Sequence, residues 1–308
     1  MLFKQFRLFQ LNPSVNYSSG NIEKYCEKFP FRSCMPSLPL SSGWVGILDE
    51  DDSPMIRTVS NCIVFCAQFE EKILPAAVVQ KALRDKVKEI EKKEGRVIRQ
   101  KEKWSMKDDI IMTLLPRAFS KFTKVYAYID SRHHWLIVGT TNEKKTEQFL
   151  TLFKKTMDDE AQPFALKKIP SILTNWVKEK NYPDSLNVEK KCVLQDPDQF
   201  NRVIRCQEQN LFSTSIQGLI KEGCEVKQLG LSWQDQINFV LHDDFSIRCV
   251  KFQDSVLEQS ESMEPETNQQ QFDADFIIIQ AVFSTLIKKL LDLFKEPVKA
   301  VSHAEELV

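Results

Sequence analysis

One segment of this 308-residue chain carries more charge than the core of a protein can accept. Between residues 72 and 107, twelve lysines and arginines stand against five acids, which gives a net charge of +7. Apolar residues nevertheless recur there at spacings of four and three from Val79 to Ile90, a pattern that predicts a helix with one narrow apolar stripe. Such a stripe can cover only a small core, so we expect the segment to protrude from the rest of the protein.

The ends of two helices can be placed around this segment. Pro75 suits the first turn of a helix, and Gly95 interrupts the apolar stripe. Ser105, with an acid three residues later, resembles a capping box, which predicts that a second helix begins there and ends at Pro116. We therefore predict a helical hairpin over residues 76–118, called the basic hairpin below.

Outside the basic hairpin, the chain is dominated by short strand patterns joined by turns. No regular alternation of strands and helices is present, and many connections are short enough for hairpins. The prediction is an α+β fold with mostly antiparallel sheets and flanking helices. A polar linker over Glu258–Gln271 is expected to precede a last helix from about Phe272 to Phe294.

Composition narrows the classes of function. Only 8 of the 308 residues are glycine, well below the usual level of roughly 7%, which disfavours nucleotide-binding enzymes because their phosphate loops need glycine. The formal charge of −1 excludes a uniformly basic nucleic-acid binder but allows one with segregated charge. Residues 251–275 hold part of the balancing charge, with a net of −6.

The basic hairpin suits electrostatic binding to DNA. Side chains on a helix of about nineteen residues spread over roughly 28 Å, enough to meet several phosphates. From charge alone, the candidate DNA-binding residues are Lys81, Arg84, Lys88 and Lys92. Two alternatives remain open: a solvated helix with pairs such as Glu89 and Lys93, or a contact between the basic and acidic segments within a subunit or a dimer.

A short block after the basic hairpin interleaves cations with aromatic rings. It contains Arg117, Phe119, Lys121 and Phe122, which are expected in or beside a turn that follows Pro116. This mixture suits a nucleic-acid surface, or a protein contact in which a phenylalanine fills a pocket. The alternative is that both phenylalanines pack beneath the basic hairpin.

No recognised catalytic motif is present, and we expect neither enzymatic activity nor a cofactor or bound metal. His242, Asp243 and Asp244 could form the metal site of a nuclease, but they separate two strand patterns and fit a hairpin turn better. Asp130 and His133 also fall at a predicted strand-to-strand turn. Eight cysteines without a CxxC pair, and no apolar run long enough for a bilayer, predict a reduced cytoplasmic protein.

Several separated blocks of the chain resemble the bacterial recombination-associated protein RdgC family. The blocks are Glu70–Pro75, Leu114–Phe122, Leu173–Val177, Leu231–Trp233, Phe239–Asp244 and Phe272–Phe276. They occur in the same order and at similar spacing over nearly the whole chain, which is a more specific signal than any single motif.

The resemblance implies a non-enzymatic DNA-binding protein associated with the nucleoid. Members of this family form a ring-shaped homodimer with a positively charged hole for duplex DNA. They bind DNA with little sequence preference and restrain RecA-type recombinase near replication forks. The resemblance also implies a centre domain over residues 1–75 and 119–175, a tip formed by the basic hairpin, and a C-terminal base domain over 176–308.

The resemblance also suggests roles for particular residues. It places Phe119, with Phe122 beside it, where two tips meet across the dimer. In the base domain it points to a loop with Arg202, Arg205 and Gln209 as weaker candidates for DNA contact. Relatives carry lysine near the position of Glu208, and an acid there would weaken contact with phosphate.

Overall fold

A six-stranded antiparallel sheet forms the centre of the computed structural model, which describes residues 3–48, 50, 53–199, 201–262 and 265–295. Its strands follow the order β1–β6–β5–β4–β2, and β3 also pairs with β4. Their bounds are β1 Arg7–Gln10, β2 Leu40–Val45, β3 Ile56–Val59, β4 Cys62–Ile73, β5 Phe119–Asp130 and β6 Trp135–Val138. This sheet has the antiparallel character that the turn-rich sequence predicts.

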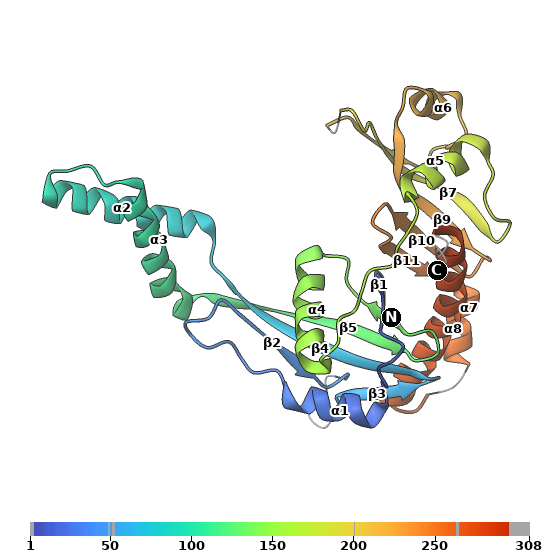
Figure 1. Ribbon diagram of the computed structural model, residues 1–308, viewed down its shortest axis with the longest axis horizontal. Coiled ribbons are helices and arrows are strands. Elements are labelled where there is room, and N and C mark those ends of the chain that lie inside the picture. The colour runs from blue at the N-terminus through green and yellow to red at the C-terminus, as the bar shows by residue number, and fades with distance from the viewer. Residues whose placement is uncertain (1–2, 49, 51–52, 200, 263–264, 296–308) are drawn as a thin grey trace, which may run out of the picture.

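Strands β4 and β5 extend well beyond β6 on one side, and end two residues beyond β2, which pairs with β4 as far as Glu71, on the other. They pair continuously over twelve residues each, from Cys62 opposite Asp130 to Ile73 opposite Phe119, a length of about 40 Å. The pairing of β6 with β5 stops at Ala127, so the outer part of this ribbon leaves the body of the protein. The basic hairpin lies at its end (Figure 1).

The basic hairpin consists of α2 (Ala76–Glu94), α3 (Gln100–Leu114) and a short 3-10 turn over Leu115–Arg117. Gly95 ends α2 with φ of +64°, a left-handed conformation that glycine adopts without strain. The prediction that the second helix begins at Ser105 is wrong. The Glu102 carboxylate accepts a hydrogen bond from the backbone N–H of Arg99 at 3.4 Å and thereby starts α3 earlier, so Ser105 lies inside the helix.

Helices cover both faces of the central sheet. On one face, α1 (Ser19–Lys28) and α4 (Glu143–Met157) enclose a core in which the rings of Trp44, Phe65 and Phe149 meet. Asn142 caps α4, because its Oδ1 accepts from the backbone N–H of Lys145 at 3.0 Å. The other face packs against α8 (Asn268–Phe294).

A second antiparallel sheet forms the C-terminal part, in the order β11–β10–β9–β7–β8. The remaining bounds are α5 Ile169–Glu179, β7 Leu186–Gln195, β8 Val203–Gln207, α6 Thr214–Lys221, β9 Glu225–Trp233, β10 Ile237–His242, β11 Ile247–Phe252 and α7 Asp254–Glu261. The two sheets are joined where Phe6, just before β1, exchanges two backbone hydrogen bonds with Ile247 of β11. The α+β prediction is confirmed, whereas the three-domain division stays a prediction.

The predicted linker before the last helix is too long. Helix α7 extends to Glu261 and α8 begins at Asn268, so both ends of the polar stretch Glu258–Gln271 are helical. Thr267 caps α8 through its Oγ1, which accepts from the backbone N–H of Gln270 at 3.2 Å. The helix therefore starts four residues before the predicted Phe272, because a cap overrides the low apolar content of its first turn.

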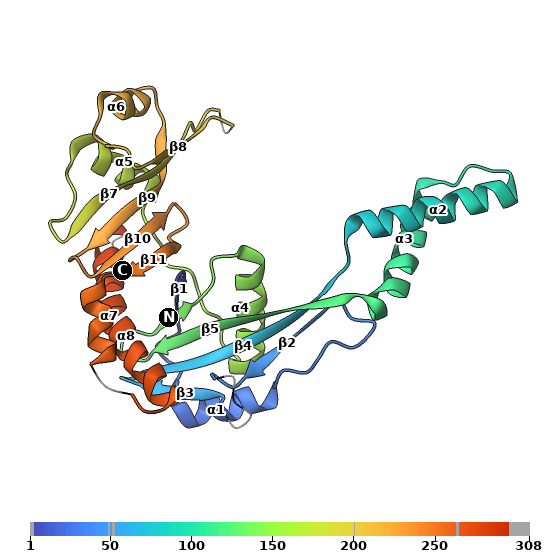
Figure 2. The same ribbon diagram turned by 180° about the vertical axis from the view of Figure 1, so that it is seen from behind.

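The basic hairpin and the second sheet stand at opposite ends of the central sheet. Both rise from the same side of it, which leaves an open concave side between them (Figures 1 and 2). None of the helices in the described part of the chain is long and apolar enough to cross a bilayer.

The attachment of α8 to the central sheet can be tested through one ion pair. Arg57 on β3 donates to both carboxylate oxygens of Asp273 on α8, with a distance of 2.6 Å for its Nη2. We expect Asp273→Asn to lower the free energy of unfolding by about 1–2 kcal/mol in a urea titration, because a charge-assisted hydrogen bond is lost. The control Asp292→Asn, on an exposed position of the same helix, should leave it unchanged.

The ion pairs between the ribbon and α4 predict that the stability of the fold depends on pH. The ammonium groups of Lys144 and Lys145, which form ion pairs with the Glu71 carboxylate at 2.8 and 2.9 Å, lower the pKa of Glu71 on β4 from 4.5 to about 2. This pair therefore stabilises the fold fully above pH 4.5, and the contribution is lost as the pH falls toward 2. The variant Glu71→Gln should show a smaller fall in melting temperature across that interval, and an identical acid profile would contradict the assignment.

Candidate nucleic-acid interface

The four candidate cations of α2 lie on one side of the helix. Lys81, Arg84, Lys88 and Lys92 follow one another at spacings of three and four, which places them along one stripe, and all four are exposed. The stripe is about 16 Å long at the rise of an α-helix. This arrangement offers several positive charges along one line at the end of the ribbon.

Most cations of the basic hairpin have no acidic partner. Lys93 pairs with Glu89 at 2.6 Å, as the alternative of a solvated helix predicts, and Arg96 pairs with Glu94 and Glu102 at 2.7 and 2.9 Å. The cations in α2, α3 and the turn between them that form no ion pair with any other described residue are Lys81, Arg84, Lys86, Lys88, Lys92, Arg99, Lys101, Lys103 and Lys107. The basic hairpin therefore keeps a large uncompensated positive charge.

The core of the basic hairpin is as thin as the narrow stripe predicts. Val79 and Val87 of α2 are buried, together with Ile98 in the turn and Ile110 of α3. The outer surface keeps one large ring in solvent, because the Trp104 side chain is 65% exposed. These contacts hold two helices together and leave their remaining faces free for a partner.

Phe119 and Phe122 begin strand β5 and do not lie in a turn. Their side chains are 84% and 55% exposed, so the alternative that both pack beneath the basic hairpin is wrong. The reason is the ladder, which sets Phe119 opposite Ile73 at the end of the ribbon, beyond the helices that cover the sheet. The Phe122 ring makes an edge contact with Phe31 at a centroid distance of 6.4 Å.

The two cations of this block lie on either side of Phe119. Arg117 is exposed in the 3-10 turn that ends the basic hairpin. Lys121 is exposed on β5, opposite Glu71 in the ladder. Both therefore extend the positive surface from the basic hairpin onto the outer end of the ribbon.

The candidate DNA-binding residues of the predicted base domain lie in the second sheet, at the opposite end of the molecule from the basic hairpin. Arg202 is held by Glu222 at 2.5 Å and Asp196 at 3.5 Å, so its charge is already balanced. Arg205 is exposed on β8, the edge strand of the second sheet, and Gln209 is exposed just after it. Within one subunit these side chains and the basic hairpin are not brought together (Figure 2).

Glu208 lies between those two base candidates. It is exposed and has φ of +52°, and the next backbone N–H, of Gln209, donates to the Lys190 carbonyl at 3.3 Å. The tight backbone turns the chain sharply after β8. The acidic side chain therefore lies at the same surface as Arg205, where it reduces the local positive charge.

The segment His242–Asp244 is the predicted turn. Burial lowers the pKa of His242 to about 4, so its ring is neutral at pH 7. Although burial opposes it, hydrogen bonds from Ser246 and the charge of Arg7 hold the pKa of Asp244 below its usual value. His242 is therefore a buried neutral ring and Asp244 a structural acceptor, while the backbone N–H of Asp243 donates to the Lys227 carbonyl at 2.9 Å.

Other titratable side chains also lie in structural positions. Asp130 accepts from the backbone N–H groups of Arg132 and His133 and closes the turn between β5 and β6. Within the described ranges, no group of three or more His, Cys, Asp or Glu side chains is arranged to hold a metal ion. None of the eight cysteines, all of which lie in the described part of the chain, forms a disulfide.

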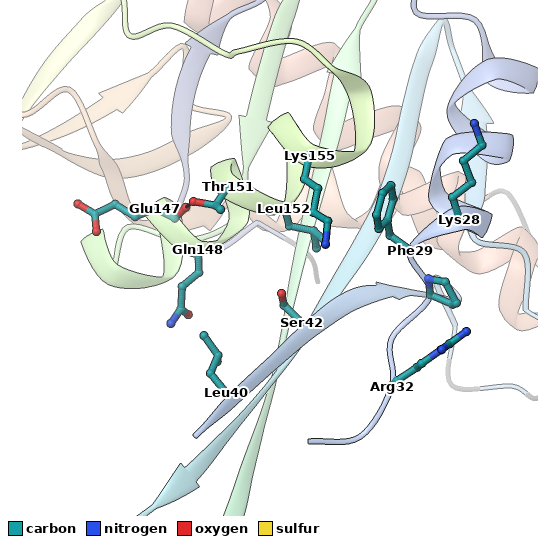
Figure 3. A pocket seen from close by; sticks show the side chains of 11 residues that line it. Lys28, Phe29, Arg32, Leu40, Ser42, Glu147, Gln148, Thr151, Leu152 and Lys155 are labelled. Carbon is teal, nitrogen blue, oxygen red and sulfur yellow. Dashed lines mark hydrogen bonds between the residues drawn. The ribbon is translucent and has the colours of Figure 1, made fainter. Parts of the chain in front are cut away.

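One cavity was not predicted from the sequence. It has a volume of about 640 Å³ and lies between the end of α1, β2 and α4 (Figure 3). Its cations come from two segments that lie more than a hundred residues apart in the sequence: Lys28 and Arg32 from the first, and Lys155 from the second. No local pattern connects them, so only the folded chain reveals the site.

The fold and the exposed charges define a class of protein: an α+β chain with two antiparallel sheets and an extended arm that ends in a basic helical hairpin. The chain belongs to the RdgC family. Residues 1–297 match the family described as "Putative exonuclease, RdgC". The resemblance seen in the sequence blocks is therefore confirmed.

Relatives of similar length support this assignment. The recombination-associated protein RdgC of Yersinia pestis strain Pestoides F is 35% identical over 296 residues, which cover 94% of this chain and 96% of the relative. The protein of the same name from Yersinia enterocolitica serotype O:8 has the same identity and coverage. One description names an exonuclease and the other an association with recombination, so the expectation of no enzymatic activity stays a prediction.

Proposed function

We propose that this protein binds double-stranded DNA without regard to sequence, as a ring-shaped homodimer that acts as a clamp. In this proposal it limits RecA-type recombinase activity during recombination and replication-fork repair, in the cytoplasm and on the nucleoid. No cofactor takes part. Membership of the RdgC family supports the link to recombination.

The observation that carries the proposal is the uncompensated charge of the basic hairpin, held away from the body by the ribbon. Cations that neutralise phosphates release condensed counterions, which gives affinity that depends strongly on salt. Contacts of this kind reach the backbone of DNA and carry no sequence information. Lys81, Arg84, Lys88 and Lys92 are the proposed contacts, with Arg117 and Lys121 extending the surface.

The concave side suggests how two copies form a clamp. If the ends of two basic hairpins meet and the two base regions also meet, the concave sides enclose a hole. Phe119 is the proposed anchor of the contact between the arms, with Phe122 beside it, because exposed aromatic rings dominate many interfaces. A closed ring slows dissociation by topology, so moderate electrostatic affinity suffices for retention.

In this proposal the C-terminal base domain contributes less to the affinity for DNA than the basic hairpin does. Arg205 and Gln209 face solvent at the edge of the second sheet, whereas Arg202 is neutralised by two acids. Glu208 repels phosphate at the same place. We therefore assign most of the electrostatic affinity to the arm.

A second candidate is a protein-interaction module whose basic hairpin binds acidic partner surfaces. The exposed Trp104 and Val97 favour it, because large exposed apolar side chains are typical of protein contacts. This alternative predicts no affinity for duplex DNA at physiological salt. A metal nuclease built on His242, Asp243 and Asp244 has no such supporting observation, and it predicts Mg²⁺-dependent cleavage that is lost in Asp243→Ala.

The first test is binding to a duplex of random sequence across a salt series. We expect the slope of log K against log salt to fall in magnitude by up to about four units in the double variant Lys81→Gln with Arg84→Gln, because each subunit of the dimer loses two cations. The control, Lys178→Gln with Lys288→Gln, removes the same charge from exposed positions on α5 and α8 and should change the slope less. Absence of duplex binding at low salt would reject the DNA proposal.

The dimer contact is tested by Phe119→Ala. The ring is 84% exposed, so the free energy of unfolding should change by less than about 0.5 kcal/mol. Loss of an interface anchor should weaken the dimer by about thirtyfold, measured by sedimentation, and shorten retention on circular DNA. A variant at another exposed apolar residue, Ile277→Ala, should keep the dimer, and an unchanged mass for Phe119→Ala would disprove its role.

A further inference from the structure

The unpredicted cavity between α1, β2 and α4 has the properties of a ligand site. Its volume of about 640 Å³ lies within the range of small-molecule sites in proteins, roughly 300–1,000 Å³. Its walls are formed by Lys28, Phe29, Pro30, Arg32, Leu40, Ser42, Glu147, Gln148, Thr151, Leu152 and Lys155. We call it the α1–α4 groove.

The α1–α4 groove is positively charged. Lys28, Arg32 and Lys155 are exposed at its walls, and none of them forms an ion pair with another residue of the described chain. Glu147 is the one acid in the lining, and its side chain points away from Lys155 and Phe29 (Figure 3). A net charge of this sign, in a concave site, favours an anion.

The same groove offers a flat apolar wall. Phe29 is half-buried, and the Lys155 ammonium lies 4.9 Å from the centre of its ring. Leu40 and the buried Leu152 extend the apolar surface. An anionic group and a planar ring can therefore be bound side by side.

Polar groups are also available for orientation. The Oε1 atom of Gln148 is buried at the wall of the groove and accepts no hydrogen bond from the described residues. A buried carbonyl oxygen without a donor is costly, which favours rotation of the Gln148 amide into the groove, where a ligand N–H group can donate to it. The Ser42 hydroxyl lies nearby (Figure 3).

The α1–α4 groove continues toward the arm. A second hollow of about 460 Å³ shares Leu40 and Gln148 with it and is lined by Lys72, Lys121 and Lys144. Lys72 and Lys144 lie beside Glu70 and Glu71, whereas Lys121 forms no ion pair among the described residues. The groove is therefore connected with the positive surface at the outer end of the ribbon.

We propose that the α1–α4 groove binds a nucleotide through its phosphate and base. The Lys28 ammonium lies 5.2 Å from the centre of the Tyr25 ring, outside the groove, and adds only to the positive field. Arg32 and Lys155 would hold the phosphate, Phe29 would stack on the base, and Gln148 would turn to accept a base N–H. The nucleotide is either free or the 5′-phosphorylated end of a DNA strand. The choice of a nucleotide over other flat anions rests on the proposed function in DNA binding.

The test is calorimetry on the full chain with four probes: dTMP, thymidine, and an eight-residue thymidine oligonucleotide with a 5′-phosphate or a 5′-hydroxyl. We expect a phosphate-bearing probe to bind and its partner without phosphate to bind far more weakly. Arg32→Gln and Lys155→Gln should each lower the affinity about tenfold, because a charge-assisted hydrogen bond is lost. Both side chains are exposed, so the fold should persist.

The matched control is Lys154→Gln. Lys154 neighbours Lys155 on α4, but its Nζ pairs with Glu160 at 3.1 Å, outside the groove. Its variant should bind like the wild type. Phe29→Leu should weaken dTMP binding but not the binding of inorganic phosphate, which has no base to stack.

The outcomes separate the two sources of the nucleotide. Binding of dTMP indicates a free nucleotide, and binding of the 5′-phosphorylated oligonucleotide alone indicates a strand end. No binding by either phosphate-bearing probe, equal binding of the probes without phosphate, or an equal effect of Lys154→Gln would overturn the proposal.

The experiments distinguish failure of nucleotide binding in the α1–α4 groove from failure of duplex binding by the proposed clamp. The mononucleotide is too small to engage the arm, so Lys81→Gln with Arg84→Gln should not change its affinity. Conversely, Arg32→Gln should leave the salt slope for duplex DNA unchanged. Nucleotide binding without duplex binding would keep the groove and reject the clamp.

Discussion

The β4–β5 ladder is the interaction on which the rest of the structure depends. Twelve continuous residue pairs carry the chain out of the central sheet and back, so that the basic hairpin begins and ends at neighbouring points. Backbone hydrogen bonds, which require no particular side chains, hold this ribbon where β6 no longer covers it. The exposure of Phe119 and the reach of the hairpin cations both follow from its length.

The ribbon and the basic hairpin keep a fixed position relative to the second sheet only because the two sheets are packed together. Helix α8 packs on the central sheet, and its rings also join the core of the second sheet, where Phe283 meets Phe252. The paired hydrogen bonds between Phe6 and Ile247 add a backbone link. One continuous core therefore fixes how the two sheets are placed relative to each other, as the proposed clamp requires.

Local signals in the sequence predicted local structure well, and failed where two signals competed. The stripe from Val79 and the turn at His242–Asp244 are short-range patterns, and the structure has both. The start of α3 was misplaced because Ser105 offers a plausible cap, whereas Glu102 starts the helix earlier. The exposure of Phe119 could not be predicted, because it depends on which segments cover the ribbon.

The sequence by itself determined the family, the antiparallel α+β class, the charged protruding hairpin and the turn at His242–Asp244. Each of these depends on order, spacing or neighbouring residues along the chain. Only the tertiary structure decided which cations are free and which are balanced, as Arg202 is by Glu222 and Asp196. It also assembled the α1–α4 groove from segments far apart in sequence. Charge compensation and concavity arise from contacts between distant segments, and a linear pattern carries no record of those contacts.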